Sequence, residues 1–390
     1  MENSREYSSE LIAEPPVWVA DPVALERLQT VLAQEPVIAV DTESDSLFSY
    51  FEKVCLLQFS TPSQDYLVDP LAVDISPLGP LFADPGPEKL FHAAEYDILC
   101  LKRDYHFRFR HIFDTMIAAR VLGWKNVGLG NILQERFGIT LNKKMQRADW
   151  GHRPLSPEHL AYAREDTHYL IALRDLQLAE LERLGRLEEA REEFERLTRV
   201  EPTPHRFDPD AYWNIPGARD LDPTRLGILR ELYRLRDAQA RKEDRPPFKV
   251  LPDSTLMHLS EARPDSLREL QRIHGLSPFI LQRYGEAVLR AVARGRASPQ
   301  EHPPRPHARG GVPLDPAART RLAHLKEWRK KRAAERQVEP DVIVSNDVLF
   351  AIARTNPHTL DALVASSHLS PWKTQEYAAD LLAALHDRHK

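Results

Sequence analysis

The chain has 390 residues, of which 42% are hydrophobic and 28% charged, a composition that excludes a wholly disordered protein and allows two to four ordinary domains. It has only two cysteines, Cys55 and Cys100, which are too few for a disulfide framework and, without other ligands, for a zinc site. Residues 1–10 contain no apolar signal segment, and no run of about eighteen apolar residues occurs. We therefore expect a cytoplasmic protein without a membrane span.

The net charge of −5 hides an asymmetry along the chain. Residues 1–218 hold 23 Lys and Arg against 36 Asp and Glu, a net charge of −13. Residues 219–297 hold 16 against 11, and residues 315–390 hold 12 against 10, so both are net basic. An acidic part that binds cations, followed by basic parts that bind a polyanion, would show this pattern. Charge alone does not separate this interpretation from chance drift between domains.

The first two hundred residues alternate between strand and helix patterns. Val17–Val19 is a short strand, and Asp21 followed by Pro22 predicts the start of a helix that runs to about residue 33. Apolar runs rich in β-branched residues predict further strands at 37–43, 54–59, 66–68 and 89–93. After residue 95 the pattern becomes helical. Ser156 and the proline after it predict one long helix to about residue 184.

The second half of the chain contains an internal repeat. A shift of 93 places Leu229–Val292 on Leu322–Leu385 without a gap, and 16 of 64 positions are identical. Apolar positions recur at helical spacing in each copy, so each copy is predicted to be a small helical bundle. Proline-rich stretches flank the copies. The predicted organisation is a first domain at 1–205, a linker at 206–218, a module at 219–297, a linker at 298–314 and a module at 315–390.

Two carboxylates lie close together in the second predicted strand. Asp41 and Glu43 are two residues apart, so both side chains point to the same face. Like charges so placed repel each other unless a cation lies between them. Asp97, which follows the strand predicted at 89–93, is flanked by apolar residues and also needs a partner. Each observation has a plainer alternative, because the strand pair could face solvent and Asp97 could favour a helix N-terminus.

Tyr162 and Asp166 are four residues apart in the long predicted helix. They share one face of that helix. The carboxylate could hold a metal ion while the phenol positions or deprotonates a water molecule. An exposed pair at this spacing is common, so the pair alone is weak evidence.

The combination of these residues resembles the DEDDy exonucleases and, more closely, ribonuclease D. The resemblance rests on Val40–Glu43, His92–Asp97, Phe113–Thr115, Asp149–Ser156 and Tyr162–Asp166. The repeat resembles HRDC domains. The resemblance implies an α/β fold, with an RNase H-like mixed-sheet exonuclease domain followed by two all-α HRDC-type domains. It also implies hydrolysis of RNA from the 3′ end to nucleoside 5′-monophosphates, in tRNA 3′ maturation or RNA turnover, with tRNA precursors as substrates.

The chemistry expected from these residues is metal-dependent hydrolysis. Carboxylate-only sites favour Mg²⁺ or Mn²⁺, and two such ions can stabilise both the attacking and the leaving oxygen of a phosphoryl displacement. We expect Asp41 to bridge two ions, Glu43 and Asp166 to complete one, and Asp97 to help hold the other. Tyr162 would orient the attacking water.

A basic stretch before the long predicted helix offers candidate substrate contacts. Lys143, Lys144, Gln146 and Arg147 could receive the RNA backbone, although a solvated loop explains them nearly as well. Three nearby residues have structural interpretations. We expect Asp114 to cap a helix, His92 to be a core histidine rather than a ligand, and Trp150 to pack rather than stack on a base.

Basic residues also line the first predicted helix of each repeat, which suits either a nucleic-acid surface or a solvated helix face. They are Arg230, Arg234, Arg236, Arg241 and Lys242 in the first copy, and Lys326, Arg329, Lys330, Lys331 and Arg332 in the second. We expect a monomer. Two alternatives stay open: a 3′-5′ DNA exonuclease, because nothing in the sequence identifies a reader of the 2′-hydroxyl, and a catalytically silent nucleic-acid-binding protein.

Overall fold

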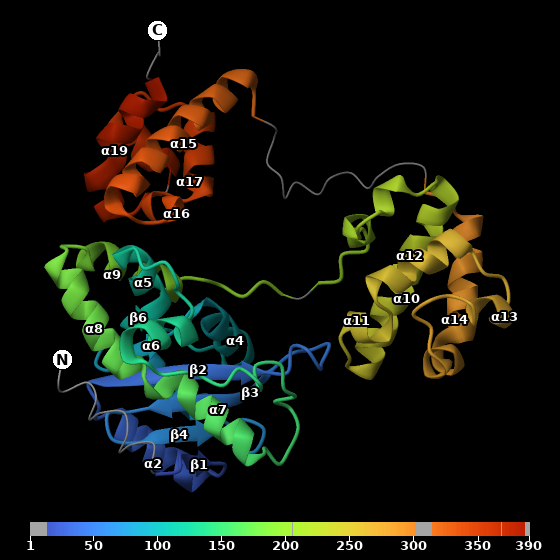
Figure 1. Cartoon of the computed structure of the whole chain (residues 1–390), viewed down its shortest axis with the longest axis horizontal. Helices are drawn as coiled ribbons and strands as arrows, with labels where there is room; N and C mark the ends of the chain where they lie inside the picture. Colours follow the sequence, from blue (N-terminus) through green and yellow to red (C-terminus); the bar gives the residue numbers. More distant parts are fainter. Residues whose placement is uncertain (1–13, 205, 301–313, 368, 387–390) are drawn as a thin grey trace. The chain divides into compact units, whose positions relative to one another are not determined.

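The computed structural model describes residues 14–204, 206–300, 314–367 and 369–386. Residues 1–13 of the predicted first domain and 301–313 of the predicted second linker lie outside the described residues, as do the last four residues of the predicted second module. The described residues form two compact units (Figure 1). One contains residues 14–44, 54–202 and 314–386, and the other contains 45–53 and 203–300. No helix of the described residues is long and apolar enough to cross a membrane.

A mixed sheet forms the centre of the first unit (Figure 1). Its strands, in chain order, are β1 (Val17–Val19), β2 (Val37–Ser44), β3 (Val54–Ser60), β4 (Asp65–Val68), β5 (Glu88–Phe91) and β6 (Ile112–Asp114). Their order across the sheet is β1-β4-β3-β2-β5-β6. β3 is antiparallel to both of its neighbours, and the other pairs are parallel. The predicted mixed-sheet α/β architecture is therefore confirmed.

Helices cover the sheet and connect its strands. They are α2 (Pro22–Leu32), α3 (Gly79–Ala83), α4 (Glu95–Tyr105), α5 (Thr115–Leu122), α6 (Leu129–Phe137), α7 (Pro157–His168), α8 (Leu170–Arg183) and α9 (Leu187–Thr198). α2 begins as predicted, because the Asp21 side chain accepts hydrogen bonds from the backbone N–H groups of Val23 and Ala24. α7 begins after Ser156, whose side chain accepts from the backbone N–H of His159.

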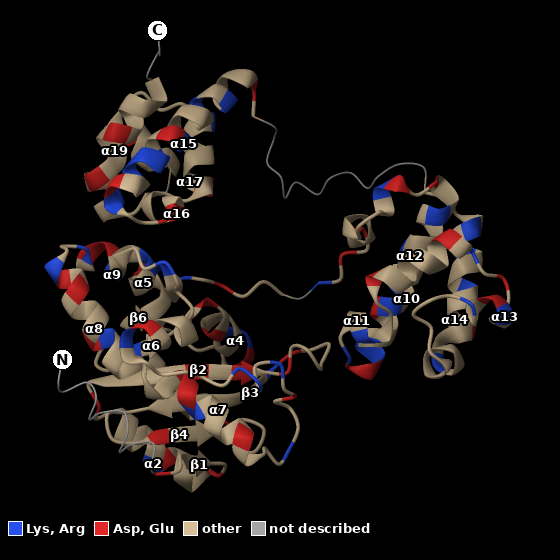
Figure 2. Ribbon diagram, viewed as in Figure 1, with Lys and Arg blue, Asp and Glu red and all other residues tan. Residues whose placement is uncertain are grey.

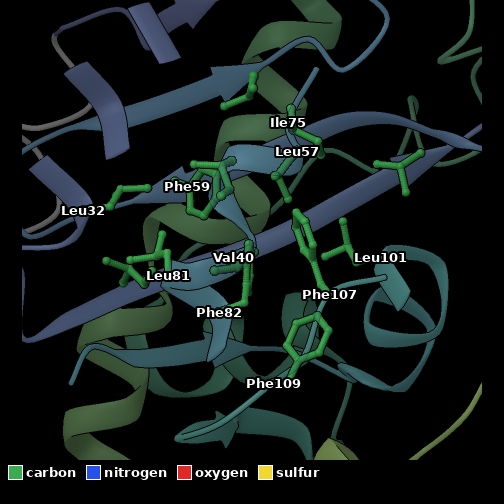
Figure 3. Packing of buried hydrophobic residues seen from close by; sticks show 14 of the residues in the cluster. Leu32, Val40, Leu57, Phe59, Ile75, Leu81, Phe82, Leu101, Phe107 and Phe109 are labelled. Carbon is green, nitrogen blue, oxygen red and sulfur yellow. The ribbon is translucent and has the colours of Figure 1, made fainter. Parts of the chain in front are cut away.

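Successive side chains of β2 and β3 point to opposite faces of the sheet. Val40 and Phe59 pair across the two strands and lie in the main hydrophobic core, together with Leu32 and Phe82 (Figure 3). On the opposite face, Leu56 packs in a cluster that includes Ala163 of α7. The residues of β2 that alternate with the core residues therefore face the side of the sheet that α7 covers.

Two elements differ from the sequence-based prediction. β6 was not predicted, because its last residue, Asp114, was interpreted only as a helix cap; it pairs with β5 and adds the sheet's edge. The long predicted helix is in fact two helices that meet at Tyr169, which has φ −95° and ψ −5°. The break follows from packing, because α7 lies against β3 and β4 whereas α8 lies against α5. Tyr162 and Asp166 both stay on α7.

Each repeat forms a helical bundle, as predicted. The first contains α10 (Pro223–Glu243), α11 (Pro247–Val250), α12 (Asp253–Ala262), α13 (Leu267–Leu270) and α14 (Pro278–Ala297). The second contains α15 (Pro316–Arg336), α16 (Pro340–Ile343), α17 (Asn346–Thr355), α18 (Leu360–Ser367) and α19 (Pro371–His386). Short 3-10 helices, η3 (Ala211–Asn214) and η4 (Ala218–Asp220), precede the first bundle, and η2 (Ser76–Leu78) lies before α3.

The shared arginine of the two repeats has the same structural role in both. Arg236 donates from Nη1 to the carbonyl of Leu251 at 3.1 Å, and Arg329 donates from Nη1 to the carbonyl of Val344 at 2.7 Å. Both arginines are buried. Including them in a nucleic-acid surface was therefore wrong, because their charge is used inside each bundle. Figure 2 shows acidic as well as basic residues on both α10 and α15.

Specific contacts explain how the chain divides into its two units. In the first unit, Arg336 of the second bundle donates from Nη1 to Glu189 of α9 at 3.0 Å. The Glu189 side chain is fully buried. In the second unit, the loop at 45–53 belongs to the first bundle's core through Tyr50, whose hydroxyl donates to Asp237 at 2.8 Å.

Candidate active site

β2 and α7 bring three carboxylates together. Asp41 and Glu43 alternate with core residues on β2, and Asp166 comes from α7. Each offers one oxygen, and these three oxygens all lie within 4.8 Å of one another. Acidic residues are visible along α7 in Figure 2. Residues 125 positions apart in the chain thus meet because α7 packs on the face of the sheet to which Asp41 and Glu43 point.

The three carboxylates lie in an open cleft of about 390 Å³. Its lining is mostly polar and comes from β2, the start of α6, the loop before α7 and α7 itself. The lining residues are Asp41, Thr42, Glu43, His92, Gly128, Leu129, Gly130, Asn131, Leu141, Asn142, Lys143, Gln146, Tyr162 and Asp166.

Burial and mutual repulsion raise the pKa of every carboxyl in the cluster. Burial, followed by the charges of Asp166 and Asp97, raises the pKa of Glu43 to about 9. Burial, followed by the charge of Glu165, raises the pKa of Asp166 to about 7. The pKa of Asp41 is also raised well above its ordinary value, by burial first and then by its acidic neighbours. Such a cluster is unfavourable as a set of bare anions, and a bound cation would relieve the repulsion.

Tyr162 lies one helical turn before Asp166 and is hydrogen-bonded to it through their side chains. Burial, followed by the negative charge of Asp166, raises the pKa of the Tyr162 phenol far above its ordinary value. In the metal-free site the phenol therefore stays protonated near neutral pH and can hold a water molecule by hydrogen bonding. The ring of Trp150 lies 5.9 Å from that of Tyr162, and Trp150 is buried, so its predicted packing role is confirmed.

Asp97 lies near the cluster but outside the set of three oxygens. Its Oδ1 accepts from the backbone N–H of Thr42 at 3.1 Å and from the Thr42 hydroxyl at 2.5 Å. Burial raises its pKa to about 7, against the lowering effect of these hydrogen bonds. Its charge in turn raises the pKa of Glu43. Asp97 is thus close enough to interact electrostatically with the cluster, while its Oδ1 is hydrogen-bonded to Thr42 of β2.

Asp114 caps α5, as predicted, and also shapes the turn that leads into α4. Its Oδ1 accepts from the backbone N–H groups of Met116 and Ile117 at 2.8 and 2.9 Å. Its Oδ2 accepts from the backbone N–H of Ala94 at 2.7 Å. Ala93, which precedes this contact, has a left-handed φ of 65°. Asp114 therefore fixes the start of the helix that carries Asp97.

His92 behaves as a structural residue. Its Nδ1 shares a hydrogen bond of 2.9 Å with the hydroxyl of Thr115, which in turn donates to the carbonyl of Phe91. Burial lowers the pKa of His92 to about 4, so the ring is neutral near pH 7. His92 lines the cleft but is outside the group of three metal-binding candidates, in line with the prediction that it is not a ligand.

The predicted substrate residues divide into two pairs. Lys143 and Gln146 line the cleft, whereas Lys144 and Arg147 are exposed outside its lining. The sequence interpretation missed the start of α6, residues 128–131, which also lines the cleft. Its two glycines were no clear signal, because a Cβ at Gly130 would meet Cε of Lys143 only at an ordinary contact distance of 3.4 Å and one at Gly128 would meet no atom within 4 Å.

The chemistry of the donor set fits a hard divalent cation. The three grouped residues offer only carboxylate oxygens, with no thiol or imidazole among them, and Mg²⁺ and Mn²⁺ prefer such ligands. Burial, and after it neighbouring negative charges, raises the pKa values of these carboxyls, so a bound cation would stabilise their charged forms. The cluster is therefore suited to hold a divalent metal ion.

Comparisons with known proteins agree with this geometry. A 3'-5' exonuclease family matches residues 16–182, and the HRDC domain matches residues 225–292 and 318–385. Ribonuclease D of Gluconacetobacter diazotrophicus is 32% identical over 331 residues, which cover 83% of this chain and 82% of that protein. The catalytic core of RRP6 from Trypanosoma brucei has 30% identity and a TM-score of 0.69, covering 74% of this chain and 81% of that one. Escherichia coli RNase D, at 24% identity and a TM-score of 0.64, has the same fold over 97% of this chain and all of that one.

Proposed function

The chain belongs to the ribonuclease D family and is a 3′-5′ exoribonuclease, and we propose that it uses two divalent metal ions, Mg²⁺ or Mn²⁺, to release nucleoside 5′-monophosphates from RNA. The meeting of Asp41, Glu43 and Asp166 within 4.8 Å is the observation that carries this proposal. Two ions bound by such a cluster would stabilise the attacking and the leaving oxygen of an in-line displacement at phosphorus.

Each side chain of the site has a part in this proposal. Asp41, whose carboxyl interacts with the charges of Asp97, Asp166 and Glu43, would be a ligand of both ions. Glu43 and Asp166 would complete the ligands of one ion, and Asp97, whose Oδ1 is bonded to Thr42, would help to hold the other.

Tyr162 orients the attacking water. Its neutral hydroxyl is held by Asp166, so its position is fixed relative to the carboxylates. Precise placement of a nucleophile contributes to rate by removing the entropy cost of finding the reactive geometry.

The proposed substrate is the 3′ end of an RNA such as a tRNA precursor. Lys143 and Gln146 line the cleft on the side of the loop before α7 and would contact its phosphates and bases. Lys144 and Arg147 lie outside the lining and would contact the backbone further from the 3′ end. We extend the proposal to the two HRDC-type modules, at 219–297 and 315–390, as additional nucleic-acid contacts that raise the local RNA concentration.

A digestion experiment tests the proposal. Purified protein should shorten a 5′-labelled RNA stepwise in Mn²⁺ or Mg²⁺, release nucleoside 5′-monophosphates and stop when the metal is chelated. Asp41→Asn should abolish this activity, whereas Glu26→Gln, at an exposed site on α2, should leave it unchanged. A matched DNA strand reports the sugar preference. Degradation of DNA alone, or of RNA in chelator, would contradict the proposal.

A further inference from the structure

Gln58, in the middle of β3, is a buried polar side chain that the active site described above does not explain. It is fully buried at 0% exposure. Neither its Nε2 nor its Oε1 has a hydrogen-bond partner among the described residues. An amide in this condition is unusual, because buried polar groups in native proteins are nearly always paired with protein, water or an ion.

The strand register places Gln58 directly beside the metal site. Gln58 is opposite Asp41 in the antiparallel pairing of β2 with β3. Directly opposed residues point to the same face, with Cβ atoms about 5 Å apart, so a long side chain can reach its neighbour. Ser60, two residues further along and thus on the same face, shares a hydrogen bond of 2.7 Å with Thr167 of α7. Gln58 therefore lies under α7, next to Asp41.

An unpaired amide at this position is costly to the fold. Burying it without partners disfavours folding, whereas an apolar side chain of similar size would carry no such penalty. On its own face of the sheet, Gln58 is flanked by Leu56 of β3 and lies opposite Leu67 of β4, and both leucines belong to an apolar cluster. The sequence thus retains a polar group where packing alone favours an apolar one, which points to a partner that acts when the site is in use.

We propose that Gln58 is a positioning residue for the metal site: its Nε2 donates a hydrogen bond to the Asp41 carboxylate when Asp41 binds a divalent cation. This inference rests on the proposed function, because it needs Asp41 to be a ligand. A ligating carboxylate keeps lone pairs that do not face the ion, and a donor on those lone pairs fixes the direction of the others. No other side chain is shown to donate to Asp41 in the described part of the chain.

The test separates metal affinity from stability. Gln58→Leu removes the amide and keeps a similar apolar volume. Binding of Mn²⁺ to the full-length protein, followed by electron paramagnetic resonance without RNA, should weaken by about tenfold or more. The metal-free variant should unfold at the same or a higher denaturant concentration than the wild type. Activity lost at limiting Mn²⁺ should return when Mn²⁺ is raised.

Gln177→Leu is the matched control. Gln177 is also fully buried, but its Nε2 donates to the carbonyl of Thr115 at 2.8 Å. This variant should lose stability and keep wild-type Mn²⁺ affinity. Wild-type affinity in Gln58→Leu, or a less stable metal-free protein, would overturn the role assigned to Gln58. If the wild type itself binds no Mn²⁺, or Asp41→Asn binds it equally well, the proposed function fails instead.

Discussion

Replacing Asp166 with asparagine should stabilise the metal-free protein while abolishing hydrolysis. The structure gives the reason: Asp166 lies within 4.8 Å of two other carboxylates, and burial with the nearby charge of Glu165 raises its pKa to about 7. At neutral pH the folded protein therefore holds a carboxylate in a place that disfavours its charge. Asparagine has almost the same shape and carries no charge, but it is a poorer metal ligand.

The size and pH dependence of this effect follow from the pKa. The difference between the ordinary value of 3.8 and about 7 corresponds to roughly 4 kcal/mol, at about 1.4 kcal/mol per pH unit. This is an upper limit, because the cluster shares its protons among several groups. Between pH 4 and 7 the folded state binds more protons than the unfolded state, so wild-type stability falls as the pH rises. The stability of Asp166→Asn does not include this pH-dependent contribution. Its stability advantage over the wild type should therefore grow by about 2 kcal/mol between pH 5 and 8.

Chemical denaturation in chelator, followed by circular dichroism at pH 5 and pH 8, measures this difference. Asp175→Asn is a suitable control, because its side chain is 62% exposed and its effect should stay within about 0.5 kcal/mol. Saturating Mn²⁺ should reverse the order by stabilising the wild type more than the variant. A stability advantage that is absent, or that does not change with pH, would refute the reasoning about repulsion. Undiminished hydrolysis would refute the role of Asp166.

Three further substitutions test other parts of the site and the fold. Tyr162→Phe should lower kcat by roughly 10²-fold with little change in Mn²⁺ affinity, because the hydroxyl orients water and binds no metal; an equal loss of metal affinity would contradict this. Lys143→Ala should raise KM for RNA with kcat unchanged, and it should reduce the slope of log K for RNA binding against log salt concentration by about one. An unchanged slope would exclude a phosphate contact. Arg329→Ala should destabilise the second bundle by roughly 2–3 kcal/mol, because it leaves the Val344 carbonyl without its donor; a smaller loss in denaturation would show that the buried arginine is dispensable.

The parts of the fold that the sequence predicted are those with a clear period. The apolar run in β2 and the alternation that follows it predicted that Asp41 and Glu43 share a face, and the spacing of Tyr162 and Asp166 predicted a common helical face. The meeting of β2 with α7 was an expectation from family resemblance, because local patterns do not contain long-range packing.

What the sequence could not show depends on contacts between distant residues. β6 forms by pairing with β5, and the break at Tyr169 arises from the different packing partners of α7 and α8. Asp97 accepts a hydrogen bond from Thr42, and this is a tertiary contact between residues 55 positions apart. Gln58 lies within a predicted strand, and only the pairing register shows that it is opposite Asp41. The buried arginines of the repeats likewise looked like surface charge until the bundles were described.

Anomalous diffraction from crystals soaked in Mn²⁺ with a non-hydrolysable RNA tests most directly whether these carboxylates form a metal site. We expect two Mn²⁺ peaks in the cleft, with Asp41 bound to both, Glu43 and Asp166 bound to one, and the 3′-terminal phosphate between them. Peaks elsewhere, or an ordered RNA 3′ end in the cleft with no Mn²⁺ beside Asp41, would contradict the proposed mechanism.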